Sequence, residues 1–276
     1  MGYEKLNIMK NLLFTLALLI SFGSFGQNTI ETKYTPPEGY ERTYNDAYSK
    51  FLREFPLKEN NIVKYYDGEE KYNDNIWDAV FDYKTGTHRW HQCADAAIYL
   101  NALYNYENKL YNKLSFHFTN GDLTTYNDWL SGIDYKVDSN DTNKLIKYQS
   151  EDRVDNFETF LNWLTERVML WAGTWSMENR NDVIQIDIGE MMPGDIFLES
   201  MESPSSPGHA VTVVDVVKNQ NGKKKFILSQ SYMPSQEQQI LINPENGSVW
   251  YSLDEFKDVV TPQWSFTVTQ LKRFNN

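Results

Sequence analysis

The chain has 276 residues, 38 acidic against 26 basic side chains, a net charge of −12 and a single cysteine. This acidic balance argues against a nucleic-acid partner, because affinity for nucleic acid depends on Lys and Arg contacts to phosphates. It argues equally against an anionic membrane surface. One cysteine excludes an intrachain disulfide, and a chain of this length can bury enough surface to fold without one.

The first thirty residues have the pattern of a secretory signal peptide. Lys10 precedes an apolar run over 12–20, and small residues follow at Ser24 and Gly26. The run is shorter than the ~20 residues of a membrane span, and a retained N-terminal anchor is the alternative. We therefore expect residues 1–26 to be removed. Residues 27–276 are then expected to form one globular domain, periplasmic or extracellular, with no stable membrane span.

The first half of the expected mature chain mixes helices and strands. Residues 93–106 are a predicted helix, because Ala and Leu residues recur on one side at helical spacing. Residues 132–150 are polar and predict a loop. Other segments are assigned by their period and composition: helices over 42–55 and 122–130, and strands over 61–66, 76–83 and 114–119.

The second half changes from helix to strand. Apolar residues at helical spacing predict a helix over 156–172, and Asn221-Gly222 predicts a hairpin turn between two strands. Helices followed by a run of antiparallel strands indicate the α+β class. The predicted strands cover 196–199, 209–217, 226–232, 239–242 and 264–271.

The only cysteine, Cys93, stands at the beginning of the predicted helix 93–106. A thiol at a helix N-terminus lies at the positive end of the helix dipole, which favours the nucleophilic thiolate. Free backbone N–H groups of the same turn are placed to hold an oxyanion. Asp95, in this turn, is an ordinary residue for complementing the dipole. The alternative for Cys93 is a buried side chain that acts as a small hydrophobe.

His209 follows Pro207-Gly208 and opens a predicted strand, where it stands at a sheet edge. Taken alone, a histidine at such a position has a structural hydrogen bond as its alternative role. In combination with a single cysteine it is a candidate base, because a cysteine nucleophile needs a base that the fold brings within reach.

A base also needs a polar group that fixes the orientation of its ring. Side chains alternate across a strand, so the length of the predicted hairpin loop decides which residues share a face. With an even number of loop residues, His209 faces the same side as Gln230 and Tyr232. An odd number would substitute Ser229 and Ser231. We favour Gln230.

These segments occur in an order that resembles the CHAP and NlpC-type amidases and peptidases of the papain-like fold. The segments are Gln92-Cys93 at a helix start, Pro193-Gly194-Asp195 before a strand, Gly208-His209 at the next strand, and a polar residue on the strand after it. The resemblance implies a papain-like α+β fold, with the cysteine-bearing helix packed on an antiparallel sheet.

The same resemblance implies hydrolysis of amide bonds in a cell-wall peptide or protein substrate. It implies Cys93 as the nucleophile, His209 as the base and Gln230 as the orienting residue. We assign Gln92 to the oxyanion site and Tyr232 to substrate contacts. The chain departs from the pattern in two ways: an acidic residue usually stands where Gln230 is, and the interval between Cys93 and His209 is long.

A more extensive similarity covers most of the mature chain. Several segments resemble those of a family of exported bacterial proteins, the domain-of-unknown-function family 4846, a resemblance that supplies no mechanism. They are Gln92–Ala96, Phe116–Gly121, Pro207–Val211, Gln230–Pro234, Thr261–Trp264 and Leu271–Phe274.

Two rival interpretations remain. His88, His91, Cys93 and Asp95 could be metal ligands, but residues two apart on a helix point to different sides, and the spacing is not that of a zinc site. We therefore expect no metal and no cofactor. The other rival is a non-catalytic binding module of the cell envelope, in which the fold is kept and the thiol is inert.

The signal-peptide interpretation predicts a processed N-terminus. N-terminal sequencing of the protein from the cell-envelope fraction should find Gln27 as the first residue, within a few positions. An intact Met1 or Met9 in that fraction would contradict cleavage.

Overall fold

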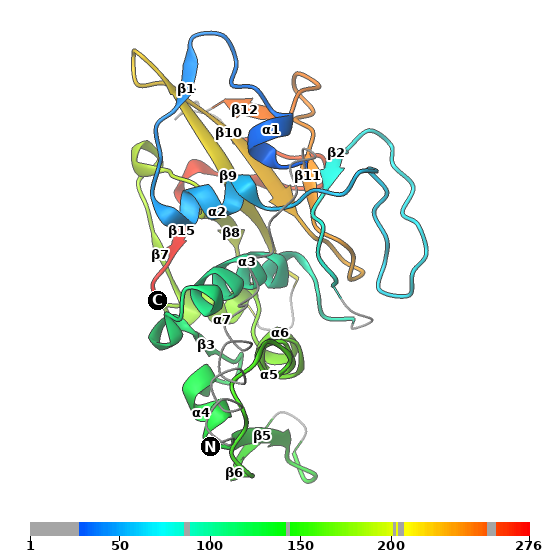
Figure 1. The fold of residues 1–276 in the computed structure, drawn as a ribbon. Coiled ribbons are helices and arrows are strands. Elements are labelled where there is room, and N and C mark those ends of the chain that lie inside the picture. The colour runs from blue at the N-terminus through cyan, green and yellow to red at the C-terminus, as the bar shows by residue number, and fades with distance from the viewer. Residues whose placement is uncertain (1–27, 86–88, 142–143, 201–202, 204–206, 253–257) are drawn as a thin grey trace, which may run out of the picture.

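An antiparallel sheet forms the centre of the structure (Figure 1). The computed structural model describes residues 28–85, 89–141, 144–200, 203, 207–252 and 258–276, so the expected signal peptide lies outside the described residues. Within these ranges the sheet contains β1 (Tyr40–Arg42), β2 (Trp77–Val80), β7 (Val183–Gln185), β8 (Ile196–Glu199), β9 (His209–Asn219), β10 (Lys224–Gln230), β11 (Gln239–Leu241), β12 (Trp250–Ser252) and β15 (Leu271–Phe274).

Most of these strands pair in the order β2-β11-β10-β9-β8-β15-β7, and every pairing is antiparallel. Strand β1 joins at the far end of β9, and β12 joins β10. Three two-stranded sheets are separate from this one. They are formed by β3 (Ser115–His117) with β4 (Leu123–Thr125), β5 (Ile133–Val137) with β6 (Leu145–Gln149), and β13 (Val259–Val260) with β14 (Ser265–Phe266).

The helices lie on one side of the large sheet and in the lower part of Figure 1. The mixture of helices with a large antiparallel sheet confirms the α+β class. The helices are α1 (Ile30–Lys33), α2 (Ala47–Glu54), α3 (Cys93–Glu107), α4 (Tyr126–Leu130), α5 (Phe157–Trp163), α6 (Met169–Trp171) and α7 (Thr174–Asn179).

The predicted hairpin between β9 and β10 is confirmed, and its register contains a shift. Lys218 pairs with Lys224, and Gly222 takes the positive φ of +81° that the turn requires. The register shifts by one residue between Ile227 and Leu228. This bulge reverses which side chains of the strand ends share a face.

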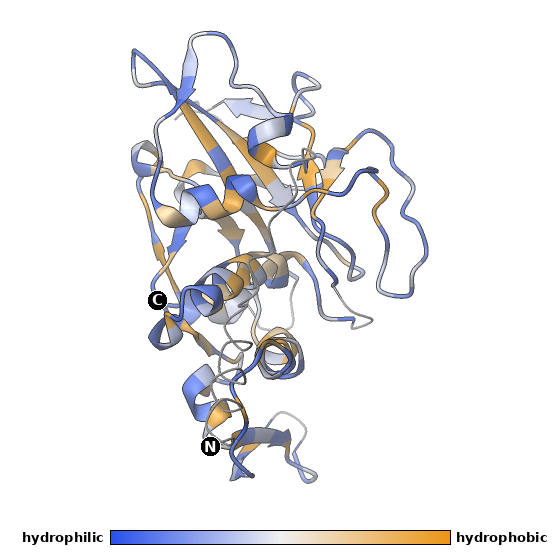
Figure 2. Ribbon diagram, viewed as in Figure 1, coloured by the Kyte–Doolittle hydropathy of each residue, from blue (hydrophilic) through white to orange (hydrophobic). Residues whose placement is uncertain are grey.

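Helix α3 is buried on nearly all sides, where the sequence pattern predicted a single apolar stripe. Ala94 and Ala97 belong to the core cluster that also contains Ala210 and Val214 of β9, so one side of α3 packs on the sheet. Phe116 and Trp163, from the lower part of the structure, belong to the same cluster. The helix is therefore enclosed from two directions, which its small and apolar residues permit. Figure 2 shows these hydrophobic segments meeting at the centre.

The other face of the sheet carries a second core cluster. Val211 and Val213 of β9 and Phe226 and Leu228 of β10 belong to it, together with Phe266 of β14. From Ala210 to Val214, alternate residues of β9 thus divide between the two clusters, as the period of a strand requires. Beyond the bulge the alternation reverses, with Val216 in the second cluster and Val217 in the first.

Two predicted elements are each divided in the structure. The predicted strand 264–271 consists of β14, a 3-10 turn over Val268–Gln270 and the start of β15, and the predicted helix 122–130 consists of β4 followed by α4.

Three further segments differ from the sequence predictions. Residues 132–150, predicted as a loop, form the β5–β6 hairpin, whose largely exposed side chains leave no clear alternation in the sequence. Residues 61–66 form no strand, only isolated bridges at Lys64 and Tyr65. The predicted helix 156–172 is divided by a π-helical segment, Leu164–Val168, between α5 and α6.

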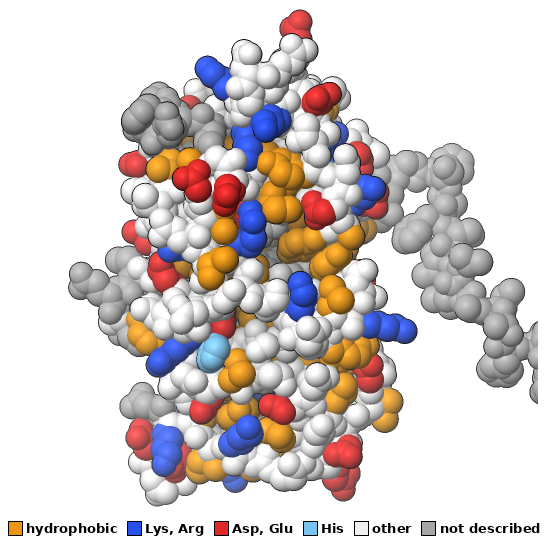
Figure 3. All heavy atoms as spheres, turned by 90° about the vertical axis from the view of Figure 1, so that its left-hand side faces the viewer, with side chains coloured by type: hydrophobic (Ala, Val, Ile, Leu, Met, Phe, Trp, Pro, Cys, Tyr) orange, Lys and Arg blue, Asp and Glu red, His pale blue; other side chains and the backbone are white. Residues whose placement is uncertain are grey.

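Charges on the surface are mixed. Figure 3 shows acidic and basic side chains interspersed over one face. In the part of the chain that the structure describes, no helix is both long enough and apolar enough to cross a membrane.

Gly208 allows β9 to begin in close contact with two other elements. A Cβ at this position would lie 2.2 Å from the Glu199 carbonyl oxygen of β8 and 2.6 Å from the Thr174 hydroxyl of α7. We expect Gly208→Ala to lower the free energy of unfolding by about 1–3 kcal/mol, because the backbone of β8 must move. Urea unfolding measures this change.

Gly173 provides the matched control for Gly208→Ala. It borders the same region, but a Cβ there would meet nothing within 4 Å. Gly173→Ala should therefore leave the unfolding midpoint nearly unchanged. Equal effects of the two substitutions would contradict the close contact at Gly208.

Candidate functional site

Cys93 is the first residue of α3, with Gln92 as the N-cap residue. The helix begins here because the Asp95 carboxylate accepts a hydrogen bond from the Gln92 N–H at 2.8 Å. Cys93 is buried, with 6% of its surface exposed. The sequence prediction of a thiol at a helix start is confirmed.

The thiol lies against the backbone of β9. Its Sγ donates to the Gly208 carbonyl oxygen at 4.0 Å. A hydrogen bond from the backbone N–H of Ala210 acts to lower the pKa of the thiol. These two residues flank His209 in the sequence, so the thiol of the predicted nucleophile lies against the backbone on either side of the predicted base. Among the described residues, no hydrogen bond joins the thiol to the His209 ring.

His209 and Gln230 form the pair that the sequence suggested. Nε2 of His209 lies 2.8 Å from Oε1 of Gln230, and Nε2 of Gln230 donates to Oε1 of Gln263 at 2.8 Å. An amide oxygen only accepts hydrogen bonds, so Nε2 of His209 carries the proton. In the neutral ring, Nδ1 is then the nitrogen that can accept a proton.

The pairing of His209 with Gln230 depends on a register shift in the hairpin that the sequence did not show. The loop between Lys218 and Lys224 has an odd number of residues, which by itself would place Ser229 and Ser231 with His209. The one-residue register shift after Ile227 reverses this assignment of faces. Gln230 and Tyr232 therefore share the face of His209.

That face is the one turned away from α3. The His209 ring packs against Tyr232 at 4.9 Å between ring centroids, Trp264 at 5.2 Å and Phe266 at 5.9 Å. Phe266 belongs to the second core cluster, whereas α3 packs on the opposite face with Ala210. The thiol thus lies at the strand backbone, and the imidazole lies on the far side of that strand.

Burial keeps both groups neutral. Desolvation, with a further contribution from the Asp95 charge, raises the pKa of Cys93 to about 11. Desolvation lowers the pKa of His209 to about 4, although its hydrogen bond to Gln230 acts in the opposite direction. The expectation that the helix dipole favours a thiolate is therefore wrong for the isolated protein, because the cost of burial exceeds the dipole effect.

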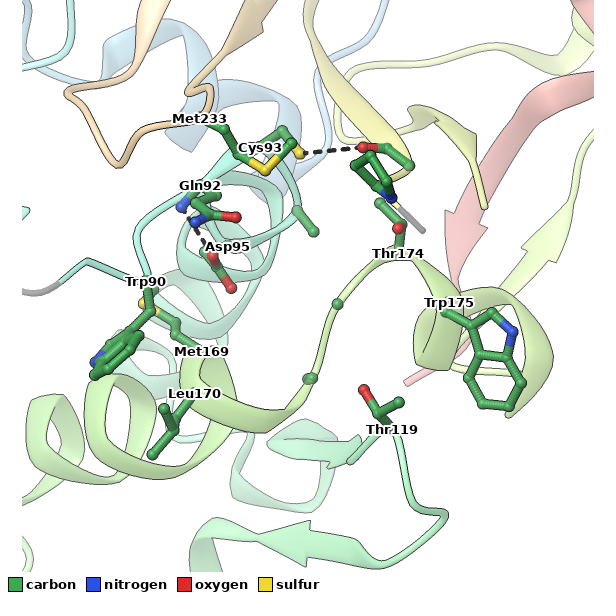
Figure 4. Close-up of a pocket in the computed structure, with 15 residues that line it drawn as sticks. Trp90, Gln92, Cys93, Asp95, Thr119, Met169, Leu170, Thr174, Trp175 and Met233 are labelled. Atoms are coloured by element: carbon green, nitrogen blue, oxygen red, sulfur yellow. Dashed lines mark hydrogen bonds between the residues drawn. The ribbon is translucent and has the colours of Figure 1, made fainter. Parts of the chain in front are cut away.

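A pocket of about 260 Å³ opens beside the thiol (Figure 4). It lies between the first turn of α3, the start of β9 and the segment that joins α6 to α7. Met233 and Thr119 complete it from two other loops. Its lining residues are Trp90, Gln92, Cys93, Ala94, Asp95, Thr119, Met169, Leu170, Ala172, Gly173, Thr174, Trp175, Pro207, Gly208 and Met233.

Of the two residues assigned to the oxyanion and the substrate, Gln92 lines the pocket and Tyr232 does not. The Gln92 side chain donates to the Arg89 carbonyl at 3.2 Å. Tyr232 contacts the His209 ring, and burial together with the nearby Cys93 raises its pKa. Tyr232 therefore belongs to the surroundings of the base.

The rival metal interpretation gains no support from the described side chains. His91 is buried, its Nε2 lies 2.9 Å from the Tyr83 hydroxyl, and desolvation lowers its pKa to about 3. In the described part of the chain no group of three or more His, Cys, Asp or Glu side chains is arranged to hold a metal ion. His88 lies outside the described residues.

Comparison with known families covers almost the whole described chain. The family described as Domain of unknown function (4846) matches residues 30–273. The chain belongs to this family. The sequence resemblance to it is thereby confirmed, and Cys93, His209 and Gln230 lie within the matched range. No curated protein and no solved structure matches the chain.

Sequence reasoning missed three parts of the site. Gln263 orients Gln230, and Trp264 packs on His209; both lie in a segment already noted for its family resemblance. The segment 169–175 forms a wall of the pocket, and its sequence carries no signal of that role. Asp95 was interpreted as a dipole-complementing residue, yet it lines the pocket.

The electrostatics of Cys93 predict its reaction with an alkylating reagent. Iodoacetamide should label the native protein slowly at neutral pH, with a rate that rises toward a midpoint near the thiol pKa of about 11. Asp95→Asn should move this midpoint downward, because it removes the negative charge that raises the thiol pKa. Mass spectrometry of Cys93 against pH measures both.

Glu107→Gln, at the other end of α3, is the control for Asp95→Asn and should leave the midpoint unchanged. A wild-type midpoint below the free thiol value of about 8.5 would contradict this description of the site.

Proposed function

We propose that the chain is an exported cysteine hydrolase of amide bonds, with a papain-like arrangement of Cys93, His209 and Gln230. The observation that carries the proposal is the position of the thiol at the pocket, held by backbone groups on both sides of His209. The ring of that histidine is oriented by Gln230 at 2.8 Å. Peptides of the cell wall or of exported proteins are the proposed substrates.

The reaction begins with transfer of the thiol proton to Nδ1 of His209. Sγ then attacks the amide carbonyl, and the backbone N–H of Cys93, with Gln92 at the edge of the pocket, holds the oxyanion. The intermediate collapses as the amine leaves with the proton from His209. A water molecule hydrolyses the remaining thioester, returning the acid product and the free thiol.

These reaction steps are compatible with a resting site in which both Cys93 and His209 are neutral. With the pKa of Cys93 near 11 and that of His209 near 4, the resting pair is thiol and imidazole, not an ion pair. Proton transfer must then accompany substrate binding. Catalytic hydrogen bonds are often long before a substrate is bound and shorten in the complex.

A second candidate function is a non-catalytic binding module that uses the same pocket. The observation that favours it is the burial of the His209 ring, which is 1% exposed and lies on the opposite face of the sheet from α3. In this alternative Cys93 contributes only to packing and to the pocket wall.

Turnover separates the two functions. Release of amines from purified cell-wall fragments and from a mixed peptide library should be lost in Cys93→Ala and in His209→Ala, each by about 10⁴-fold or more. The double variant should be no worse than either single one, because the residues act as a unit. Gln230→Ala should lose less, since Gln230 only orients the ring.

His117→Ala serves as the histidine control. His117 lies on β3, and its side chain pairs with that of Asp182. It does not line the pocket and should be dispensable for turnover. A folded wild-type protein that releases nothing from either substrate would leave the binding module as the function, and full activity of Cys93→Ala would exclude the thiol mechanism.

A further inference from the structure

One oxygen of the Asp95 carboxyl is buried without a partner. Asp95 is 5% exposed, and its Oδ2 accepts the hydrogen bond from the Gln92 N–H. Oδ1 has no hydrogen-bond partner among the described residues. A buried acceptor left unpaired destabilises the protein, and more so if it is charged. The capping of α3 therefore accounts for one oxygen of this carboxyl and leaves the other unexplained.

The unpaired carboxyl belongs to the pocket that contains the thiol. Asp95 and Cys93 both lie in the first turn of α3, and both line the pocket. Figure 4 shows the Asp95 side chain extending from α3 into the space bordered on the other side by Thr119 and Thr174. A ligand that satisfies Asp95 is consequently held next to any group bound at the Cys93 thiol.

The remaining lining residues indicate which kind of donor fits. Of the described residues that line the pocket, only Asp95 and Cys93 have ionisable side chains, so no described Lys or Arg of the lining competes for the carboxyl. Trp90 and Trp175 lie on opposite sides of the pocket in Figure 4, and indole faces attract cations. The Trp175 ring already has the Arg180 guanidinium 5.3 Å from its centroid, so the indole for a ligand cation is that of Trp90. The net charge of −12 also raises the local concentration of cations near the protein.

We propose that Asp95 is the recognition group for a primary ammonium group of a peptide ligand, which binds in this pocket beside Cys93. An ammonium group brings both the missing hydrogen-bond donor and the opposite charge, which together offset the cost of burying the carboxylate. The inference names the substrate class of the proposed hydrolase and rests on that function only for the fate of the bound peptide.

Binding of the ammonium group has a consequence for the thiol. The Asp95 charge is one cause of the high pKa of Cys93. Pairing this charge with an ammonium group lowers the thiol pKa, because the unfavourable interaction between two negative charges is then compensated. A peptide with the correct amine thus makes its own nucleophile easier to ionise, whereas a peptide without it does not.

Calorimetric titration of the mature Cys93→Ala protein tests binding without turnover. The probes are acetyl-Ala-Lys-Ala-amide, with a side-chain amine, Ala-Ala-Ala-amide, with an α-amine, and acetyl-Ala-(Nε-acetyl-Lys)-Ala-amide, with neither. At least one amine should bind about tenfold or more tightly than the fully acetylated peptide, a difference of about 1.4 kcal/mol. The tighter of the two identifies the source of the amine.

Asp95→Asn in the same background should reduce the affinity of the amine to that of the acetylated peptide. Asn keeps an acceptor for the Gln92 N–H, and Glu107→Gln is the control that should change nothing. Equal binding of acetylated and free-amine peptides, no binding of either, or an amine affinity unchanged by Asp95→Asn would each overturn the proposal. If Asp95→Asn fails to fold, the comparison of peptides in the Cys93→Ala protein decides alone. Hydrolysis is not measured, so failure of the hydrolase proposal leaves this result intact.

Discussion

The position of the Cys93 thiol depends on where β10 ends. The backbone N–H and C=O of Val213 form hydrogen bonds with Asp195 and Gly194, on the β8 side of β9. Successive residues of a strand direct their backbone groups to opposite neighbours, so the Ala210 N–H and the Gly208 carbonyl point to the β10 side. Strand β10 ends at Gln230 and does not reach them. Buried backbone groups need partners, and the thiol at the start of α3 supplies one for each. The N-terminus of α3 therefore contacts the sheet through the Cys93 thiol, and the pocket lies beside this contact.

This close contact also determines the electrostatics. Helix dipoles contribute about 0.3–1 kcal/mol near a surface and up to ~2 kcal/mol in favourable geometries. Raising the thiol pKa from 9.0 to about 11 corresponds to about 3 kcal/mol in the opposite direction. Burial consequently wins over the dipole. The same exclusion of water lowers the pKa of His209 and raises that of Asp95, so burial makes the charged form of each of the three groups less favourable.

The sequence predicted those parts of the fold whose residues show a regular apolar stripe or a continuous apolar run. Helix α3 and strands β8 to β10 were predicted close to their observed bounds for this reason. The pairing of His209 with Gln230 was predicted from side-chain parity, but two features compensate, an odd loop and a bulge after Ile227. A bulge inserts one residue without changing composition, so parity cannot reveal it. The orphaned oxygen of Asp95 was also invisible, because a carboxylate in a first helical turn has the same sequence signature whether or not both oxygens are satisfied.

The two faces of the sheet divide the site between them. His209, Gln230 and Gln263 lie on the face of the second core cluster, and Asp95 and the pocket lie on the side of α3. Cys93 lines the pocket and lies against the backbone of Gly208 and Ala210, the residues on either side of His209. In the proposed reaction, the substrate thus reaches the sulfur from the α3 side while the proton leaves toward the other face. Such a separation protects the imidazole from solvent and from the ligand's ammonium group, which would otherwise compete with the thiol as the proton donor to Nδ1. Asp95 can then hold the ammonium group of the ligand on one side of Cys93, while His209 removes the thiol proton on the other side.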